Sequence, residues 1–281
     1  MIFRIRHETV YRYSAEAGLE PHAVRLEPRN DPAQRVRGFS LEITPKPVRI
    51  SRALDAEGNS VSYAFFEGRT DELHIRTQLE AETLRTNAFD FLFLDPDQAR
   101  LPFAYPAGHT LAADYRTASS SDPAVDGLMR DARREGGEGT VGFLTRLAEL
   151  IPERVSPAIR EEGHPMTPAE TLASGEAACR DLTVLYLECV RRSGLAARFV
   201  SGYQRGDPDH PRDDLHAWAE VYLPGGGWRG FDPTLGLAVA DTHVSLAAAA
   251  TPAGAAPVSG TFRGDGVTAT METKLDLDVD V

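Results

Sequence analysis

The stretch GEAACRDLTVLYLECVRRSGLAARFVSGYQ, residues 175–204, places one of the two cysteines of the chain at the start of a helix-patterned segment. Apolar residues recur there at helical spacing and form one stripe: Leu182, Leu185, Tyr186, Cys189 and Val190. Gly194 follows the stripe, where a glycine commonly ends a helix. We therefore predict a helix that begins near Cys179, followed by strands at 196–203, 216–224 and 227–233.

The two cysteines differ in their expected chemistry. Cys179 lies in the first turn, where unpaired backbone N–H groups and the helix dipole favour the reactive thiolate. Cys189 lies on the apolar stripe and is most simply a core residue. Ten helical residues separate two Cα atoms by about 15 Å, whereas a disulfide requires less than roughly 7 Å. We therefore expect two free thiols.

A cysteine nucleophile needs a base and a group that orients the base. His216 begins the strand HAWAEVYLP, and Asp232 ends the strand GWRGFDP. If these strands form a hairpin about Pro224 and Gly225, the two side chains lie roughly opposite one another, so that the carboxylate can fix the imidazole tautomer. A histidine at a strand end and an aspartate before proline are also common as surface and turn residues. A Cys-His-Asp zinc site is a further alternative, although the chain lacks paired Cys-x-x-Cys or His-x-x-x-His spacing.

The first hundred residues read as strands. FSLEIT (39–44) and LHIRTQLEA (73–81) alternate apolar and polar residues, and a turn at 55–59 joins two further strands, with Gly58 and Asn59 able to accept positive φ. Pro- and Ser-rich segments then mark a boundary. We predict an α+β fold: an N-terminal all-β, sandwich-like domain at 1–100, and a second domain at 101–281 in which a helix packs on an antiparallel sheet.

Three further segments of the second domain can be interpreted. TVGFLTRLAELI (140–151) has helical spacing, with Thr140 as the expected N-cap. The Ala-rich stretch SLAAAATPAGAAPVSG (245–260) reads as a loose connection over the surface. TATMETKLDLDV (268–279) alternates and predicts a strand, whose sheet the sequence does not identify.

The net charge and the distribution of apolar residues limit which partners and which cellular location we expect for the protein. The formal net charge of -12 argues against nucleic acid or an anionic membrane surface as the main partner. The N-terminus carries charges and lacks a signal-peptide core, and no run approaches the ~20 apolar residues of a membrane span. From the missing signal and membrane segments we expect a cytoplasmic protein. We also expect no cofactor, because the sequence lacks a dense carboxylate loop of the EF-hand type that would bind calcium.

The segments ACRDLTVLYLECVRRSGLAARFVSGY and LHAWAEVYLPGGGWRGFDPT resemble the transglutaminase-like superfamily, in its bacterial branch of predicted cysteine proteases. In that family Cys-[RQ]-D opens the helix, His-Ala-Trp supplies the base and Asp-Pro-Thr the acid. The resemblance implies a papain-like core with Cys179 as nucleophile, His216 as general base and Asp232 as its orienter. The N-terminal strands resemble the bacterial transglutaminase-like N-terminal region. Ala177-Ala178, Leu215 and Leu235 depart from the usual Gly-Val, Ser and Asn, but no reacting group is lost.

The expected function is thiol-dependent acyl transfer on amide bonds of a peptide or protein substrate. Water as acceptor gives a protease or amidase, which we favour, and an amine gives a protein-glutamine transglutaminase. A catalytically silent peptide-binding module is the alternative from another class. The Cys179 backbone N–H is an expected oxyanion donor, Trp218 is expected to wall the site or pack structurally, and Asp181 to brace the helix start. His164, His210 and His243 receive no role, and the sequence does not indicate the oligomeric state.

Overall fold

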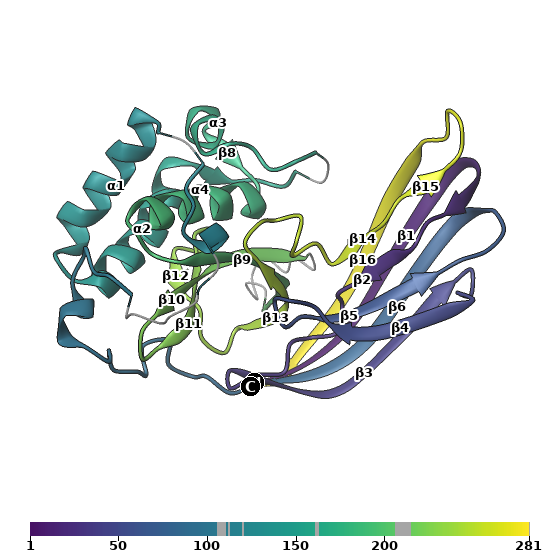
Figure 1. Ribbon diagram of the computed structural model, residues 1–281, viewed down its shortest axis with the longest axis horizontal. Helices are drawn as coiled ribbons and strands as arrows, with labels where there is room; N and C mark the ends of the chain where they lie inside the picture. Colours follow the sequence, from purple (N-terminus) through teal and green to yellow (C-terminus); the bar gives the residue numbers. More distant parts are fainter. Residues whose placement is uncertain (106–110, 112, 120, 161–162, 206–214, 281) are drawn as a thin grey trace.

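The computed structural model describes residues 1–105, 111, 113–119, 121–160, 163–205 and 215–280. Helices gather on one side of a central antiparallel sheet, and a β domain occupies the other side (Figure 1). The fold is α+β, as predicted. No helix in the described part of the chain is long and apolar enough to cross a membrane. The cytoplasmic location stays a prediction.

The β domain contains a five-stranded and a four-stranded antiparallel sheet. In the larger sheet, β1 (Ile2–Leu19) lies between β6 (Thr70–Thr83) and β16 (Ala269–Asp280); β3 (Gln34–Thr44) pairs with β6, and β15 (Phe262–Arg263) pairs with the end of β1. The smaller sheet has the order β14 (Val258–Ser259), β2 (His22–Val24), β5 (Ser60–Phe65), β4 (Arg49–Leu54). The strands predicted at 39–44 and 73–81 are parts of β3 and β6.

The C-terminal strands belong to the β domain in space. β16, yellow in Figure 1, runs beside the purple β1 in an unbroken antiparallel register from Ile2↔Asp280 to Tyr13↔Ala269. The domain limits 1–100 and 101–281 stay predictions, but the last strands, which that division placed in the second domain, pair with strands of the first. Alternation alone could not reveal this pairing, because any sheet with one solvated face accepts such a strand.

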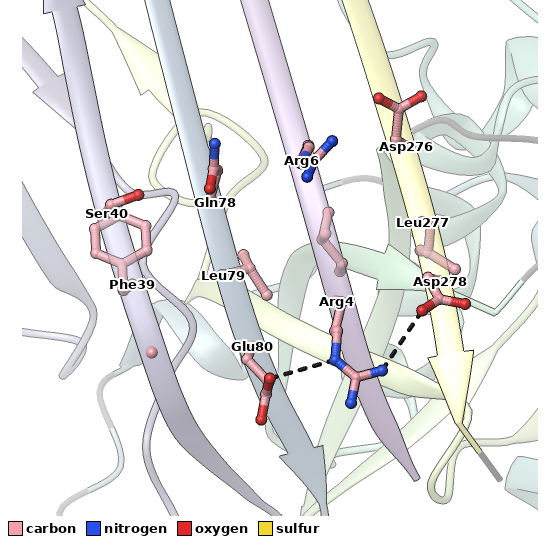
Figure 2. A pocket seen from close by; sticks show the side chains of 12 residues that line it. Arg4, Arg6, Phe39, Ser40, Gln78, Leu79, Glu80, Asp276, Leu277 and Asp278 are labelled. Atoms are coloured by element: carbon pink, nitrogen blue, oxygen red, sulfur yellow. Dashed lines mark ion pairs between the residues drawn. The ribbon is translucent and has the colours of Figure 1, made fainter.

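The outer face of the larger sheet is ionic. Alternate residues of β1 point outward, and the Arg4 guanidinium lies 3.4 Å from Glu80 of β6 and 3.5 Å from Asp278 of β16 (Figure 2). A shallow hollow on this face is lined by residues of β1, β3, β6 and β16 and includes none of the three predicted site residues. Because such pairs are exposed, each contributes little to stability.

The central sheet has the order β12 (Leu237–Ala238), β11 (Gly227–Asp232), β10 (His216–Leu223), β9 (Ala197–Gln204), β13 (His243–Ala249). Helices α1 (Pro123–Gly136), α2 (Thr140–Arg154), α3 (Pro168–Ser174) and α4 (Cys179–Arg192) accompany it, together with the 3₁₀ helices η1 (Pro96–Ala99) and η2 (Ala113–Tyr115) and the short parallel pair β7 (Ser156–Pro157) and β8 (Glu176–Ala177). The predicted Cys179 helix is α4.

Two local expectations are corrected. Gly139, not Thr140, is the N-cap of α2; Thr140 is its first helical residue, and its hydroxyl donates to the Gln98 carbonyl instead. At the 55–59 turn only Gly58 has positive φ, at 76°. Asn59 keeps an ordinary backbone, and its fully buried amide serves another purpose, described below.

The first part of the Ala-rich stretch, residues 245–249, is not a surface connection, whereas residues 250–260 include exposed turns as predicted. That first part belongs to β13, in which every residue from His243 to Ala249 is buried. Val244 and Leu246 pack into the core of the β domain, while Ala247 and Ala249 pack into the core under the helices. The small alanine side chains fill the narrow space on the helical side, so a composition typical of a loop here forms a fully enclosed strand.

Candidate active site

The start of α4 is fixed by a buried carboxylate. Asp181 is 0% exposed and accepts hydrogen bonds from the backbone N–H of Ala178 (3.0 Å), from the backbone N–H of Met166 (2.8 Å) and from Arg160 Nη2 (2.6 Å). An acidic side chain in the first turn satisfies donors that the helix leaves unpaired there. Just before Cys179, Ala177 pairs with Pro157 in the β7–β8 ladder. Asp181 therefore braces the helix start, as the sequence suggested.

Cys179 is the first residue of α4 and is partly exposed, whereas Cys189 is buried. Both thiols are free. Burial raises the pKa of the Cys189 thiol far above its ordinary value, so this thiol stays protonated and inert. Of the two cysteines, only Cys179 offers a sulfur atom that a substrate can approach.

The hairpin β10–β11 carries the other two predicted residues. Its register, Leu223↔Gly227 through Ala219↔Phe231, centres on Gly225, which has a φ of 89° that suits glycine. Asp232 therefore follows the last paired position and faces His216 diagonally rather than directly. His216 Nε2 nevertheless donates to Asp232 Oδ2 over 2.7 Å, since such diagonal neighbours are within reach of longer side chains.

Asp232 is 0% exposed, and both of its oxygens are hydrogen bonded. Oδ1 accepts the backbone N–H of Thr234 at 2.8 Å and of Leu235 at 3.2 Å, while Oδ2 accepts from His216 and from His243 at 3.0 Å. Burial raises the pKa of this carboxyl, but the two imidazoles outweigh burial and hold the pKa well below its usual range. The group is a permanent anion at neutral pH.

His216 interacts with both neighbours predicted for it. Burial alone lowers its pKa, but the Asp232 charge and hydrogen bond, followed by the hydrogen bond and charge of Cys179, raise the pKa to about 10. Because Nε2 is bonded to Asp232, Nδ1 is the ring nitrogen left for the thiol. The Trp218 ring stacks on the imidazole at a centroid distance of 6.3 Å. Cys179, His216 and Asp232 thus lie together, and their catalytic roles remain predictions.

Sequence reasoning missed His243. This residue begins β13, the strand at the other edge of the central sheet from β12, and it is buried. Its imidazole hydrogen bonds to Asp232 from that side of the sheet. The one local signal is the alternation of Val244 and Leu246 after it, which the adjacent run of alanines obscures. His164 is exposed and outside this cluster, and His210 lies outside the described residues.

The atoms of His216, Asp232 and His243 that could bind a metal ion lie within 4.8 Å of one another. In this arrangement each Nε2 instead points its proton at the shared Oδ2, at 2.7 and 3.0 Å. A metal ion would have to displace the proton that each Nε2 donates to the buried carboxylate, so the arrangement is explained by hydrogen bonding.

Comparisons with known proteins show which family and fold this chain resembles. Residues 3–82 match the bacterial transglutaminase-like N-terminal region, and residues 139–233 match the transglutaminase-like superfamily. Uncharacterized proteins of Mycobacterium tuberculosis and Mycobacterium leprae are each 26% identical, over 257 residues (83% of this chain, 78% of the relative) and 301 residues (98% and 96%) respectively. A putative cysteine protease from Cytophaga hutchinsonii has a similar structure, with a TM-score of 0.67, 21% identity, and coverage of 100% of this chain and 92% of that chain. The family resemblance and the fold class inferred from the sequence are thus confirmed.

Proposed function

Since the chain carries a transglutaminase-like core preceded by the bacterial transglutaminase-like N-terminal region, we propose that it catalyses thiol-dependent acyl transfer on amide bonds of peptides or proteins. Cys179 is the nucleophile, His216 the general base and acid, and Asp232 the residue that orients His216. One observation carries the proposal: the His216 imidazole contacts both the buried Asp232 carboxylate and the Cys179 thiol, and its pKa is raised to about 10.

The raised pKa determines how the reaction begins. An imidazole whose pKa is raised to about 10 is a strong base toward the thiol, so His216 takes the thiol proton as Cys179 reacts and becomes an imidazolium beside the sulfur. The thiolate attacks the amide carbonyl, and the Cys179 N–H, at the first position of α4, donates to the developing oxyanion. His216 then gives its proton to the departing amine, and an acyl-enzyme remains on Cys179.

The acceptor that resolves the acyl-enzyme defines the reaction class. We propose water, and therefore hydrolysis, with His216 as the base that activates it. Both water and a primary amine are compatible with the same three residues, so transamidation is the competing reaction of the same acyl-enzyme.

The test uses the full chain, a panel of glutaminyl peptides and an unfolded protein substrate. We expect cleavage or ammonia release without added amine, loss of both in Cys179→Ala, and retention in Cys189→Ala, the matched control at the buried cysteine. Ammonia release that requires a primary amine would establish transamidation instead. Peptide binding that is equal in wild type and Cys179→Ala, with no product in either, would refute catalysis and favour a silent binding module.

A further inference from the structure

β13 is the edge strand of the central sheet, and side chains of the β domain complete its hydrogen bonds. Gln34, at the start of β3, donates from Nε2 to the Ser245 carbonyl at 2.8 Å, and its Oε1 accepts the Ser245 N–H at 2.8 Å. The Arg29 N–H also donates to the Ser245 carbonyl, at 3.0 Å. A side-chain amide thus replaces the peptide group of a further strand.

Asn59 repeats the arrangement further along the strand. Its Nδ2 donates to the Ala248 carbonyl at 2.9 Å, and its Oδ1 accepts the Ala248 N–H at 2.8 Å. In a regular strand, residues three apart present their backbone groups to opposite edges. Here β13 pairs Ser245 with Gly202 and Ala247 with Ser201, so one extra residue forms a bulge between them. The bulge turns Ser245 and Ala248 toward the same edge, where both amides bind.

The amides of Gln34 and Asn59 together form a clamp on β13, and His243 is the first residue of this strand. The Thr83 hydroxyl of the β domain donates to the Asp241 carbonyl at 2.7 Å, two residues before it. The hydroxyl of Thr242 lies 2.9 Å from His243 Nδ1, and Nε2 lies 3.0 Å from Asp232 Oδ2. Because an ionised carboxylate only accepts hydrogen bonds, Nε2 carries the proton and Nδ1 accepts from the threonine.

The two histidines on Asp232 therefore differ in charge. Burial lowers the pKa of His243, with the Asp232 hydrogen bond and charge acting against burial and the charge of His216 acting with it. Protonation of Nδ1 would also cost its hydrogen bond from Thr242. His216 carries the charge, while His243 remains a neutral donor; among the described residues, Asp232 and His216 are the titratable groups that contact it.

We propose that His243 is a positioning residue of the site, and that the β domain, through Gln34 and Asn59, holds it against Asp232. The inference rests on the proposed function, because it assigns His243 to the support of the Asp232–His216–Cys179 set. The neutral Nε2–H stabilises the buried carboxylate and keeps Oδ2 directed at His216. The clamp gives the β domain a part in the chemistry although it contributes no reacting atom.

The charge state can be tested in the wild-type protein, labelled with ¹⁵N at the histidines. We expect imidazole NMR at pH 7 to show His216 protonated on both nitrogens and His243 protonated on Nε2 alone. A His243 ring protonated on Nδ1, or on both nitrogens, would overturn the assignment, and this measurement needs no variant that could fail to fold.

The effect on Cys179 is measured by its rate of alkylation with iodoacetamide between pH 4 and 9, followed by peptide mass spectrometry. In His243→Phe, which keeps a ring but loses the donor, we expect the midpoint of thiolate formation to rise by about 1 pH unit, a tenfold change in the ratio of thiolate to thiol. His243→Gln, which retains an N–H donor, should keep the wild-type midpoint. A folded His243→Phe variant with the wild-type midpoint would refute the positioning role.

The clamp is tested by Gln34→Leu, with Gln78→Leu as the matched control on the exposed face of β6 (Figure 2). We expect Gln34→Leu to shift the Cys179 midpoint in the same direction as His243→Phe, and Gln78→Leu to leave it unchanged. A natively folded Gln34→Leu variant without a shift would show that the β domain does not hold His243. A wild-type midpoint near the ordinary thiol pKa of about 8.5 would instead refute the proposed function itself.

Discussion

Acid should weaken this protein through one histidine between its two parts. His7 of β1 is 1% exposed; its Nδ1 lies 2.8 Å from the Tyr203 hydroxyl of β9, and its Nε2 lies 3.1 Å from the Thr9 hydroxyl. Burial lowers the pKa of His7 from 6.5 to about 4. Between these two pH values the unfolded chain binds a proton that the folded chain does not, so the free energy of unfolding falls as the pH falls.

The size of the effect follows from the shift. A difference of about 2.5 pKa units between the folded and unfolded states corresponds to about 3 kcal/mol, lost as the pH falls from 6.5 to 4 and constant below that. About 2 kcal/mol of this should already be lost at pH 5. His22 and His243, whose pKa values are also lowered, add losses of the same sign, so the contribution of His7 must be read from the difference between wild type and variant.

Urea unfolding at pH 7 and pH 5, followed by tryptophan fluorescence and circular dichroism, measures that difference. His7→Asn should be less stable than wild type at pH 7 but should lose about 2 kcal/mol less on acidification, while His164→Asn, at an exposed position, should retain the wild-type loss. Coincident transitions from the two probes are needed before a single free energy is assigned. A His7→Asn variant with the wild-type loss would refute the reasoning.

Two further predictions concern the site and the sheet beneath it. Asp232→Asn removes the charge that raises the pKa of His216, so Cys179 alkylation at pH 6 should slow on the order of tenfold in the folded variant; an unchanged rate would contradict the ion pair. Gly202→Ala would place a Cβ atom 2.1 Å from a backbone oxygen of β13 and 2.5 Å from the indole ring of β10, whereas Gly38→Ala meets nothing within 4 Å. Thermal unfolding should show a loss of about 1–3 kcal/mol only for Gly202→Ala, and equal melting temperatures for both would refute the predicted clash.

The parts of the fold that could be predicted are those that neighbouring residues determine. The apolar stripe of α4 and the glycine turn of the β10–β11 hairpin are local patterns, and they were enough to bring Cys179, His216 and Asp232 together. The register differed by two positions from the expected one, because the centre of the hairpin lies at Gly225 and no local feature specified it to one residue. The side chains of His216 and Asp232 are long enough to form their hydrogen bond in spite of this offset.

β13 and His243 could not be predicted in this way. The amides that complete β13 lie 211 and 189 residues away along the chain, at Gln34 and Asn59. Without them the segment is a run of alanines with no local preference for a strand. Its burial is a property of the assembled domains, and a histidine at its start therefore looked like a residue of a polar loop.

The same observation explains why a β domain should accompany this core. The central sheet has helices on one side and would otherwise expose Val244 and Leu246 of β13 on the other, together with the unpaired edge of that strand. An uncovered edge next to a buried charge would admit water, which weakens each hydrogen bond that orients the carboxylate. By covering β13 the β domain excludes that water, and by clamping the strand it fixes His243 against Asp232. Under the proposed function, the buried charge of Asp232 thus depends on contacts that Gln34 and Asn59 make with backbone groups 211 and 189 residues away along the chain.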